Sequence, residues 1–308
     1  MSTVYALRLA SKLAVWSAKT RRVPLGLVPV NQSVYPDRYL EVDSKEGGRK
    51  IMIEVYEPPN AVKPLPVHIN LHGSGFVVPL LGIDAEWCHY LSRELNCVVL
   101  DADYAKGPWD PAPHSLDDVL QVVEYAQSQP DWLDKSKLTI GGFSAGACLA
   151  LLASAALPKG EIRAVAAWYP PIDLRSGVPE DVPPIAGDEI PGIGPGQALT
   201  ENLVHNVFRR AYLQEGSDPS SPYLSPIMCD PSKFPPMTVV VGSKDSLYAD
   251  NVAFHKKLKE AGNDIEFIAI PRAQHAWERH VKAGMPIFDE LRQESFRKTV
   301  ERLRAAQM

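Results

Sequence analysis

The chain has 308 residues, of which 45% are hydrophobic and 22% are charged, with a formal net charge of -5 at pH 7. These proportions are typical of a folded globular protein, and the mild acidity argues against a nucleic-acid partner, which would require a basic face. The length would allow two domains of about 150 residues, but chains that alternate strands and helices often form one longer unit. We therefore expect a single domain over residues 1–308 that binds a neutral small molecule.

The N-terminus and the cysteines indicate the compartment. Arg8, Lys12 and Lys19 interrupt the apolar N-terminal stretch, so residues 1–22 fit an amphipathic helix better than a signal peptide or a membrane span. The four cysteines are widely spaced and none belongs to a CxxC pair, which predicts buried, reduced thiols. Both features favour a cytoplasmic protein with no membrane span.

Short apolar runs alternate with helical patterns along most of the chain. Segments 38–42 and 50–56 surround a Gly47-Gly48 turn and predict an antiparallel hairpin. Strands and helices in series then predict an α/β fold with a mostly parallel central sheet and helices on both faces. Buried strands are expected at 67–71, 97–101, 138–141, 164–168, 237–241 and 265–270, and helices at 85–95, 116–128, 145–156, 248–261 and 288–304.

Residues 173–226 interrupt this alternation. The stretch contains no clear strand, is rich in Pro and Gly, and has one helix-like piece at 200–213 with Thr200 as its N-cap. It lies between two predicted strands, on the side where the carboxyl ends of strands open and ligands bind in such sheets. We therefore interpret it as a lid over a site rather than as a linker.

The strand at 138–141 runs into Gly142-Phe143-Ser144-Ala145-Gly146 and then into a helix, which matches G-x-S-x-G at a strand-to-helix turn. The pentad alone is weak evidence, because Gly and Ser are common enough for it to arise by chance. Its position gives it meaning: the turn lifts the Ser144 hydroxyl above the sheet, and the helix directs its N-terminal amides toward the same spot. We predict that Ser144 is a nucleophile.

The segment His72-Gly73-Ser74-Gly75-Phe76 directly follows the strand at 67–71. It stands where the H-G-G-G motif of lipases and esterases forms an oxyanion hole from backbone N–H groups. We expect two donors from among Gly73, Ser74 and Gly75 and a third from the N–H of Ala145, while His72 braces the loop. The alternative interpretation is a simple tight turn.

A serine nucleophile needs a base and an acid that orients the base, and in α/β hydrolases the acid and then the histidine follow the serine along the chain. His275 comes after the last predicted strand and a short loop, whereas its nearest rival, His280, is expected on the next helix. Asp245 ends the loop after the preceding strand, whereas Asp250 is expected near the start of a helix. We predict a catalytic triad of Ser144, Asp245 and His275.

Six motifs in order resemble the hormone-sensitive lipase group of α/β hydrolases: H-G-S-G-F, D-x-D-Y, a pre-helix D-D, G-F-S-A-G, G-S-K-D and H-A-W. The resemblance covers the chain from Arg38 onward and implies a carboxylesterase or an arylacetamide deacetylase-like enzyme. It also implies a helical cap, formed here by residues 1–25 and 173–226. Two departures concern the pocket: Ser74 replaces the middle glycine of H-G-G-G, and Trp109 stands where the group has a glutamate.

The predicted reaction is hydrolysis of short- to medium-chain acyl esters through an acyl-enzyme intermediate. Phe76, next to the oxyanion loop, and Trp277, two residues past His275, would narrow the substrate pocket; the alternative is that one or both rings pack the core. No H-E-x-x-H or other metal spacing occurs, and we expect neither a metal nor another cofactor. The sequence leaves a homodimer open.

Other functions also remain open at this point. The same triad would serve a thioesterase, an amidase or a biosynthetic acyl-transferring hydrolase. A small-molecule receptor is an alternative from another class, because plant gibberellin receptors resemble this group. Those receptors lack the catalytic histidine, whereas His275 is present here, so we favour an enzyme.

Overall fold

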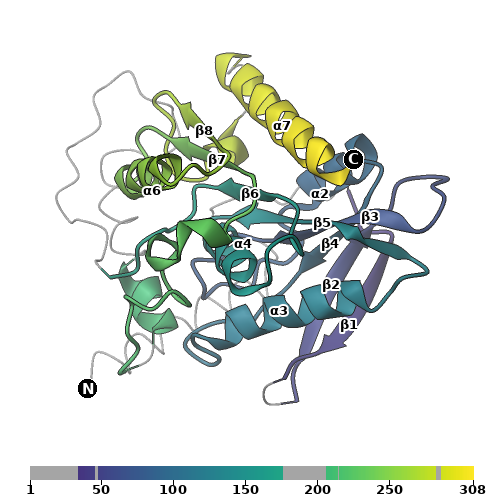
Figure 1. Ribbon diagram of the computed structural model, residues 1–308, viewed down its shortest axis with the longest axis horizontal. Coiled ribbons are helices and arrows are strands. Elements are labelled where there is room, and N and C mark those ends of the chain that lie inside the picture. The colour runs from purple at the N-terminus through teal and green to yellow at the C-terminus, as the bar shows by residue number, and fades with distance from the viewer. Residues whose placement is uncertain (1–33, 46–47, 176–205, 214, 282–285) are drawn as a thin grey trace.

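The structure is a computed structural model that describes residues 34–45, 48–175, 206–213, 215–281 and 286–308. Within these residues the chain forms one sheet of eight strands with helices packed on both faces (Figure 1). The strands are β1 (Arg38–Asp43), β2 (Lys50–Tyr56), β3 (Leu65–Leu71), β4 (Val98–Ala102), β5 (Leu133–Phe143), β6 (Val165–Trp168), β7 (Met237–Gly242) and β8 (Ile265–Ile270).

The order of the strands across the sheet is β1-β2-β4-β3-β5-β6-β7-β8. β1 pairs antiparallel with β2, and β2 pairs antiparallel with β4, whereas every pair from β4 to β8 is parallel. β4 and β5 lie on opposite sides of β3, so the chain changes its direction of travel across the sheet there. Ligands bind at the carboxyl ends of the strands beside such a switch point.

The helices cover the two faces of the sheet in separate groups. Alternate residues of a strand point to opposite faces: Val98 and Leu100 belong to one apolar cluster, and Cys97 and Val99 to another. The first cluster lies under α3 (His114–Gln127), α4 (Ala145–Ala156) and α6 (Tyr248–Glu260), and the second under α2 (Ala85–Glu94) and α7 (Pro286–Gln307).

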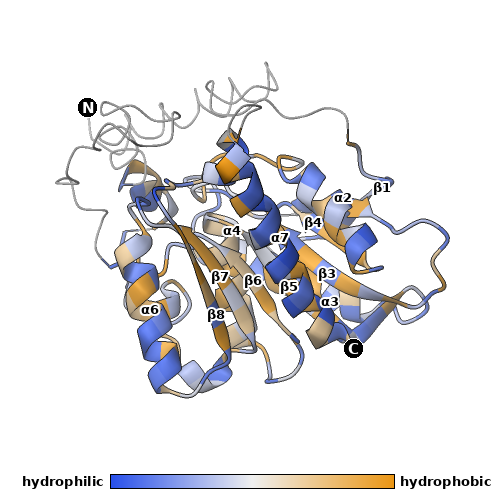
Figure 2. Cartoon of the chain, turned by 90° about the horizontal axis from the view of Figure 1, so that it is seen from above, coloured by the Kyte–Doolittle hydropathy of each residue, from blue (hydrophilic) through white to orange (hydrophobic). Residues whose placement is uncertain are grey.

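Helix α4 is the most buried of these helices. Residues 145–154 are all buried, and a helix that is apolar on all sides belongs to the core of a protein. Figure 2 shows hydrophobic residues along the strands between the helices, while α6 and α7 carry many hydrophilic residues. Because α4 begins next to the predicted nucleophile, that residue is anchored to the centre of the core.

The predicted hairpin, the later strands and the five helices are confirmed, with differences at their ends. The largest difference is β5, which was expected at 138–141 and begins at Leu133. Residues 134–137 are polar, so this part formed no apolar run, yet Leu133 and Asp134 pair with Leu65 and Pro66 of β3 before a register shift at Pro66/Val67. Helix α7 extends to Gln307, past the expected end at 304.

The predicted N-terminal helix at 1–22 and the cap segment 1–25 lie outside the described residues. Of the predicted lid at 173–226, the structure describes 173–175, 206–213 and 215–226, with a helix over 206–212. The cap and the single domain over 1–308 stay predictions.

Two simpler predictions concern the membrane and the cysteines. Among the described residues, no helix is both long and apolar enough to cross a membrane. All four cysteines are buried and free, as predicted.

Candidate active site

Ser144 lies on a sharp turn between β5 and α4. Its backbone has φ 49° and ψ -119°, and a positive φ is strained for a residue that carries a Cβ atom. The Ser144 N–H donates to the carbonyl oxygen of Trp168 at 2.8 Å, which ties the turn to the neighbouring strand β6. This is the geometry expected for G-x-S-x-G between a strand and a helix.

Two glycines make this turn sterically feasible. A Cβ atom built on Gly142 would lie 2.3 Å from the carbonyl oxygen of Leu71, and one built on Gly146 would lie 2.0 Å from the same atom. A backbone carbonyl cannot swing aside, so only glycine fits at either position. The close approach brings the end of β3, and the loop that follows it, beside Ser144.

The structure brings the three predicted triad residues together. The Nε2 atom of His275 lies 2.9 Å from the Oγ of Ser144, and its Nδ1 lies 2.8 Å from Oδ2 of Asp245. Asp245 follows β7 and His275 follows β8, which are neighbouring parallel strands, so both loops emerge at the same edge. The other oxygen of the buried Asp245 accepts the Leu247 N–H at 2.9 Å. With Nδ1–H donating to this carboxylate, Nε2 accepts the Ser144 hydroxyl proton.

The rival residues have other positions. Asp250 lies in the first turn of α6, and His255 lies further along the same helix. His280 ends the short 3₁₀ helix Trp277–His280. His205 lies outside the described residues. Among the candidates that the structure describes, His275 and Asp245 are the pair whose hydrogen bonds lead to Ser144.

The predicted oxyanion loop lies against the nucleophile. A Cβ atom built on Gly73 would lie 3.6 Å from the Cβ of Ser144 and 3.4 Å from the carbonyl oxygen of Phe143, so the Gly73 backbone borders the serine. Ala145, the first residue of α4, directly follows Ser144 in the sequence. The loop and the helix start that carry the predicted donors thus meet at one place.

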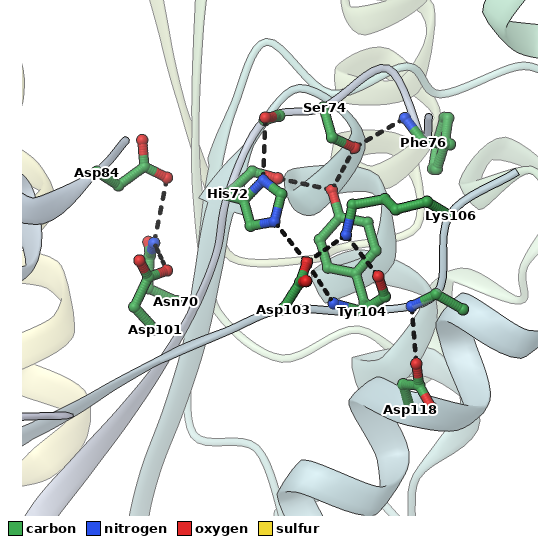
Figure 3. Close-up of polar contacts among 12 residues, drawn as sticks. Asn70, His72, Ser74, Phe76, Asp84, Asp101, Asp103, Tyr104, Lys106 and Asp118 are labelled. Atoms are coloured by element: carbon green, nitrogen blue, oxygen red, sulfur yellow. Dashed lines mark hydrogen bonds and ion pairs between the residues drawn. The ribbon is translucent and has the colours of Figure 1, made fainter. Parts of the chain in front are cut away.

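Ser74 is held inside this loop. Its Oγ accepts the Phe76 N–H at 2.8 Å and lies 2.7 Å from the Oη of Tyr104, and that Oη lies 2.7 Å from the carbonyl oxygen of His72 (Figure 3). The departure from H-G-G-G therefore braces the loop with its side chain, and Ser74 can serve as an oxyanion donor only through its backbone amide.

His72 braces the loop from the other side, as predicted. Its Nε2 lies 2.9 Å from Oδ1 of Asp103, and its Nδ1 lies 3.1 Å from the carbonyl oxygen of Gly73. Asp103 also accepts from Nζ of Lys106 at 2.5 Å, and this ammonium lies 3.5 Å from the centre of the Tyr104 ring. Burial alone would raise the pKa of Asp103, but Lys106 and His72 outweigh it and hold the pKa well below its usual range.

The two aromatic residues predicted to shape the pocket are packed in the core. Phe76 is 4% exposed and stacks on Tyr212, with ring centres 4.0 Å apart and an angle of 11° between the planes. Trp277 is 2% exposed and belongs to the apolar cluster under α2 and α7. Their part in the pocket stays a prediction.

Two further residues of the site were not predicted from the sequence. The rings of Tyr169 and His275 pack in a T-shaped arrangement, with ring centres 4.6 Å apart. The ring of Phe208 lies against Gly75, where a Cβ atom would be 2.1 Å from Cδ2 of the phenylalanine. The sequence contains only indirect signals for these two residues: Tyr169 directly follows a predicted strand, and Phe208 belongs to the helix-like piece of the predicted lid.

Comparison with known proteins gives matches in sequence. A family model for the alpha/beta hydrolase fold matches residues 68–279. An acetyl esterase from Salmonella dublin is 27% identical over 242 residues, which make up 76% of this chain and 72% of that protein. An AB hydrolase superfamily protein from Schizosaccharomyces pombe is 27% identical over 208 residues, which make up 64% of this chain and 59% of that protein. The chain thus spans less than two thirds of the yeast protein.

Solved structures match over nearly the whole chain. A thermophilic carboxylesterase cloned from a metagenomic library has a TM-score of 0.75 at 20% identity, with 100% of both chains covered. An esterase from Pyrobaculum calidifontis has a TM-score of 0.73 at 22% identity, with 99% of this chain and 93% of that chain covered. At these identities the likeness shows the fold, and the predicted fold class is confirmed.

Proposed function

This chain belongs to the alpha/beta hydrolase fold family, and on that premise we propose that it hydrolyses carboxylic esters, with Ser144 as nucleophile, His275 as base and Asp245 as the acid that orients the base. The predicted resemblance to the hormone-sensitive lipase group is confirmed by the same family match. The observation that carries the proposal is the hydrogen-bonded line from Asp245 through His275 to Ser144, at 2.8 and 2.9 Å. Relatives named acetyl esterase support an ester as substrate.

The reaction is acyl transfer to water in two halves. His275 takes the Ser144 proton on Nε2 as Oγ attacks the ester carbonyl carbon, and it gives this proton to the alcohol oxygen as the ester C–O bond breaks. The acyl group then rests on Oγ. The same imidazole deprotonates a water that attacks the acyl carbon, and the proton returns to Oγ as the carboxylic acid leaves. Asp245 stabilises the imidazolium at each transfer.

Each attack produces an oxyanion that needs fixed hydrogen-bond donors. We assign this task to two backbone amides from among Gly73, Ser74 and Gly75, together with the amide of Ala145. Removing one donor of such a hole costs about 3 kcal/mol of barrier in other hydrolases. The positive end of the α4 dipole lies at Ala145 and favours negative charge at the same place.

We further propose that the acyl chains of the substrates are short to medium. Phe208 lies against Gly75, which puts a bulky ring beside a proposed donor. Phe76 directly follows Gly75, and Trp277 lies two residues past His275. Both side chains are buried, so they cannot easily move aside to make room for a long acyl chain. We therefore expect acetyl to hexanoyl esters to react faster than long-chain lipids.

Replacing Ser144 by alanine tests the nucleophile. Ser144→Ala should fold, because a small side chain suits the turn, and should lose roughly 10³-fold or more in kcat. Ser154→Ala is the matched control, since Ser154 is a buried serine of α4, the helix that begins directly after Ser144, and donates to the carbonyl oxygen of Leu151 at 2.8 Å; it should keep wild-type activity. An organophosphate should add one adduct to the wild type and none to Ser144→Ala. A near-normal esterase rate for Ser144→Ala would refute the proposal.

The rate as a function of acyl length tests the substrate class. kcat/KM should peak between acetyl and hexanoyl across a series of p-nitrophenyl esters. A maximum at long chains, or a jump in rate above the solubility limit of the substrate, would indicate a lipase instead. Thioester and amide analogues of the best acyl group, tested with the same enzyme, show whether the triad prefers another acyl bond.

A further inference from the structure

Arg279 lies where three segments of the site meet. Its Nη1 donates to the carbonyl oxygen of Ile83 at 3.2 Å, its Nη2 pairs with the carboxylate of Asp84, and its Nε lies 3.3 Å from that of Glu278. Its Cζ lies 5.1 Å from the centre of the ring of Phe143, the residue before the nucleophile. The side chain is 12% exposed. One largely buried cation therefore joins the histidine loop, which follows β8 and carries His275, to the turn that carries Ser144 and to the start of α2.

Asp84 extends this connection to both ends of the oxyanion loop. It holds the N-cap position of α2, where a carboxylate commonly binds its own helix amides, yet it makes no such side-chain bond. It pairs with Arg279. It also accepts from Nδ2 of Asn70 at 3.2 Å, and Asn70 donates to Asp101 at 2.8 Å (Figure 3). Asn70 lies in β3, two residues before His72, while Asp84 follows the loop.

A second route leads from Arg279 to the base. The Glu278 carboxylate beside Arg279 accepts a hydrogen bond from the hydroxyl of Tyr169. The Tyr169 ring packs against the His275 imidazole in a T-shaped arrangement. If Arg279 moves, the contacts through Glu278 and Tyr169 should therefore shift the imidazole of His275.

A buried ion pair contributes little net stability, because the loss of water around both ions offsets their attraction. What it supplies here is a fixed geometry, since a planar guanidinium holds several partners in set directions. Misplacing a reacting group by about 1 Å can cost about 10²-fold in rate. We propose that Arg279 is a positioning residue that keeps the histidine loop in register with Ser144 and with the oxyanion loop. This inference rests on the proposed function, because it concerns the same triad.

The test uses variants of the full chain: Arg279→Met, Arg279→Lys and Asp84→Asn. Arg302→Met is the control, because Arg302 of α7 also pairs with a carboxylate, that of Asp264, but at the opposite end of β8 from His275. For each variant we would measure kcat and KM with p-nitrophenyl acetate, the rate at which an organophosphate labels Ser144, and thermal unfolding. The labelling rate requires no ester substrate.

Folded Arg279→Met should lose about 10- to 100-fold in kcat, with a similar loss in labelling rate and little change in KM. Arg279→Lys should fall in between, because the ammonium keeps the charge but not the fork of donors. Asp84→Asn should lose kcat as well, and a double variant that combines Arg279→Met with Asp84→Asn should be no slower than the slower single variant, since the pair acts as a unit. Arg302→Met should lower the unfolding temperature and leave kcat unchanged.

Folded Arg279→Met with wild-type kcat and labelling rate would overturn the inference. If Arg279→Met does not fold, the same result for Arg279→Lys and Asp84→Asn overturns it. If the wild type is labelled at Ser144 but cleaves no ester, the proposed function fails, and the labelling rates of the variants still decide the role of Arg279.

Discussion

The Oγ atom of Ser74 lies 2.7 Å from the Oη atom of Tyr104. Tyr104 has one hydroxyl proton, and its Oη also lies 2.7 Å from the carbonyl oxygen of His72, which can only accept. The Tyr104 proton therefore goes to His72, and Ser74 donates to Tyr104 while accepting the Phe76 N–H at 2.8 Å. The serine that departs from H-G-G-G thus closes a chain of three hydrogen bonds across the oxyanion loop.

Ser74→Ala should loosen this loop without removing any backbone donor. It leaves the Phe76 N–H unpaired, so the free energy of unfolding should fall by about 1–3 kcal/mol. kcat should fall as well, because the loop amides are aligned less well. Urea unfolding and the kcat for a short-chain ester measure the two effects. Tyr104→Phe removes the other end of the same bond, so its loss should overlap with that of Ser74→Ala in the double variant; fully additive losses would contradict the chain of hydrogen bonds.

The proximity of the three proposed triad residues could be predicted from the sequence because each of them follows a strand. Ser144 comes after β5, Asp245 after β7 and His275 after β8. Parallel strands end at one edge of a sheet, so residues far apart in the sequence meet there. The alternation of apolar runs, together with G-x-S-x-G and the order of acid and histidine after the serine, was therefore enough to predict that these three side chains lie close together.

The side chains that surround the triad could not be predicted in this way. Arg279 pairs with Asp84 across 195 positions, and Tyr169 reaches Glu278 across 109. No period or motif encodes such pairs, because they depend on how side chains from different segments pack. In the sequence, charged residues just after His275 look like surface residues, and only the fold reveals that the Arg279 side chain is no more than 12% exposed.

Asp245→Asn should keep the fold and abolish most of the activity. An asparagine can donate to Nδ1 of His275, which favours the tautomer with its proton on Nε2, and that nitrogen then cannot accept the Ser144 proton. The same change in other serine triads lowers kcat by about 10⁴-fold, and we expect a comparable loss. Asp250→Asn, in the first turn of α6, is the control and should keep wild-type kcat. A folded Asp245→Asn protein with near-normal kcat would exclude Asp245 as the orienting acid.

Gly146→Ala should lower the stability of the protein, whereas Gly73→Ala should lower kcat. A Cβ atom on Gly146 would lie 2.0 Å from the carbonyl oxygen of Leu71, so α4 must move away from β3, at a cost at or above the usual 1–3 kcal/mol or so for overpacking. A Cβ atom on Gly73 meets its neighbours at 3.4 Å or more, so that variant should fold, but its methyl group would crowd Ser144 and lower kcat. Thermal unfolding and kcat separate the two effects. A Gly146→Ala protein as stable as the wild type would contradict the close approach of α4 to β3.

The buried histidine His68 should make the protein sensitive to acid. It lies in β3 with its Nδ1 2.9 Å from Oγ1 of Thr139, and burial lowers its pKa to about 3. In the unfolded chain a histidine binds its proton near pH 6.5 or so. Between these values the unfolded chain binds more protons than the folded protein. The stability that depends on neutral His68 is therefore complete above the unfolded pKa and is lost as the pH falls, at about 1.4 kcal/mol per pH unit.

His68→Asn should remove this dependence. The amide keeps a polar partner for Thr139 and does not titrate, so the variant should be less stable than the wild type at pH 7 but should lose about 2 kcal/mol less between pH 7 and pH 5. Urea unfolding at the two pH values measures the difference. His89→Asn is the control: this residue is half-buried on α2, so removing it should change the slope less, because its imidazole keeps part of its water in the fold. If His68→Asn and the wild type lose the same free energy of unfolding over this interval, His68 takes up its proton within the fold and its burial does not cause the acid sensitivity.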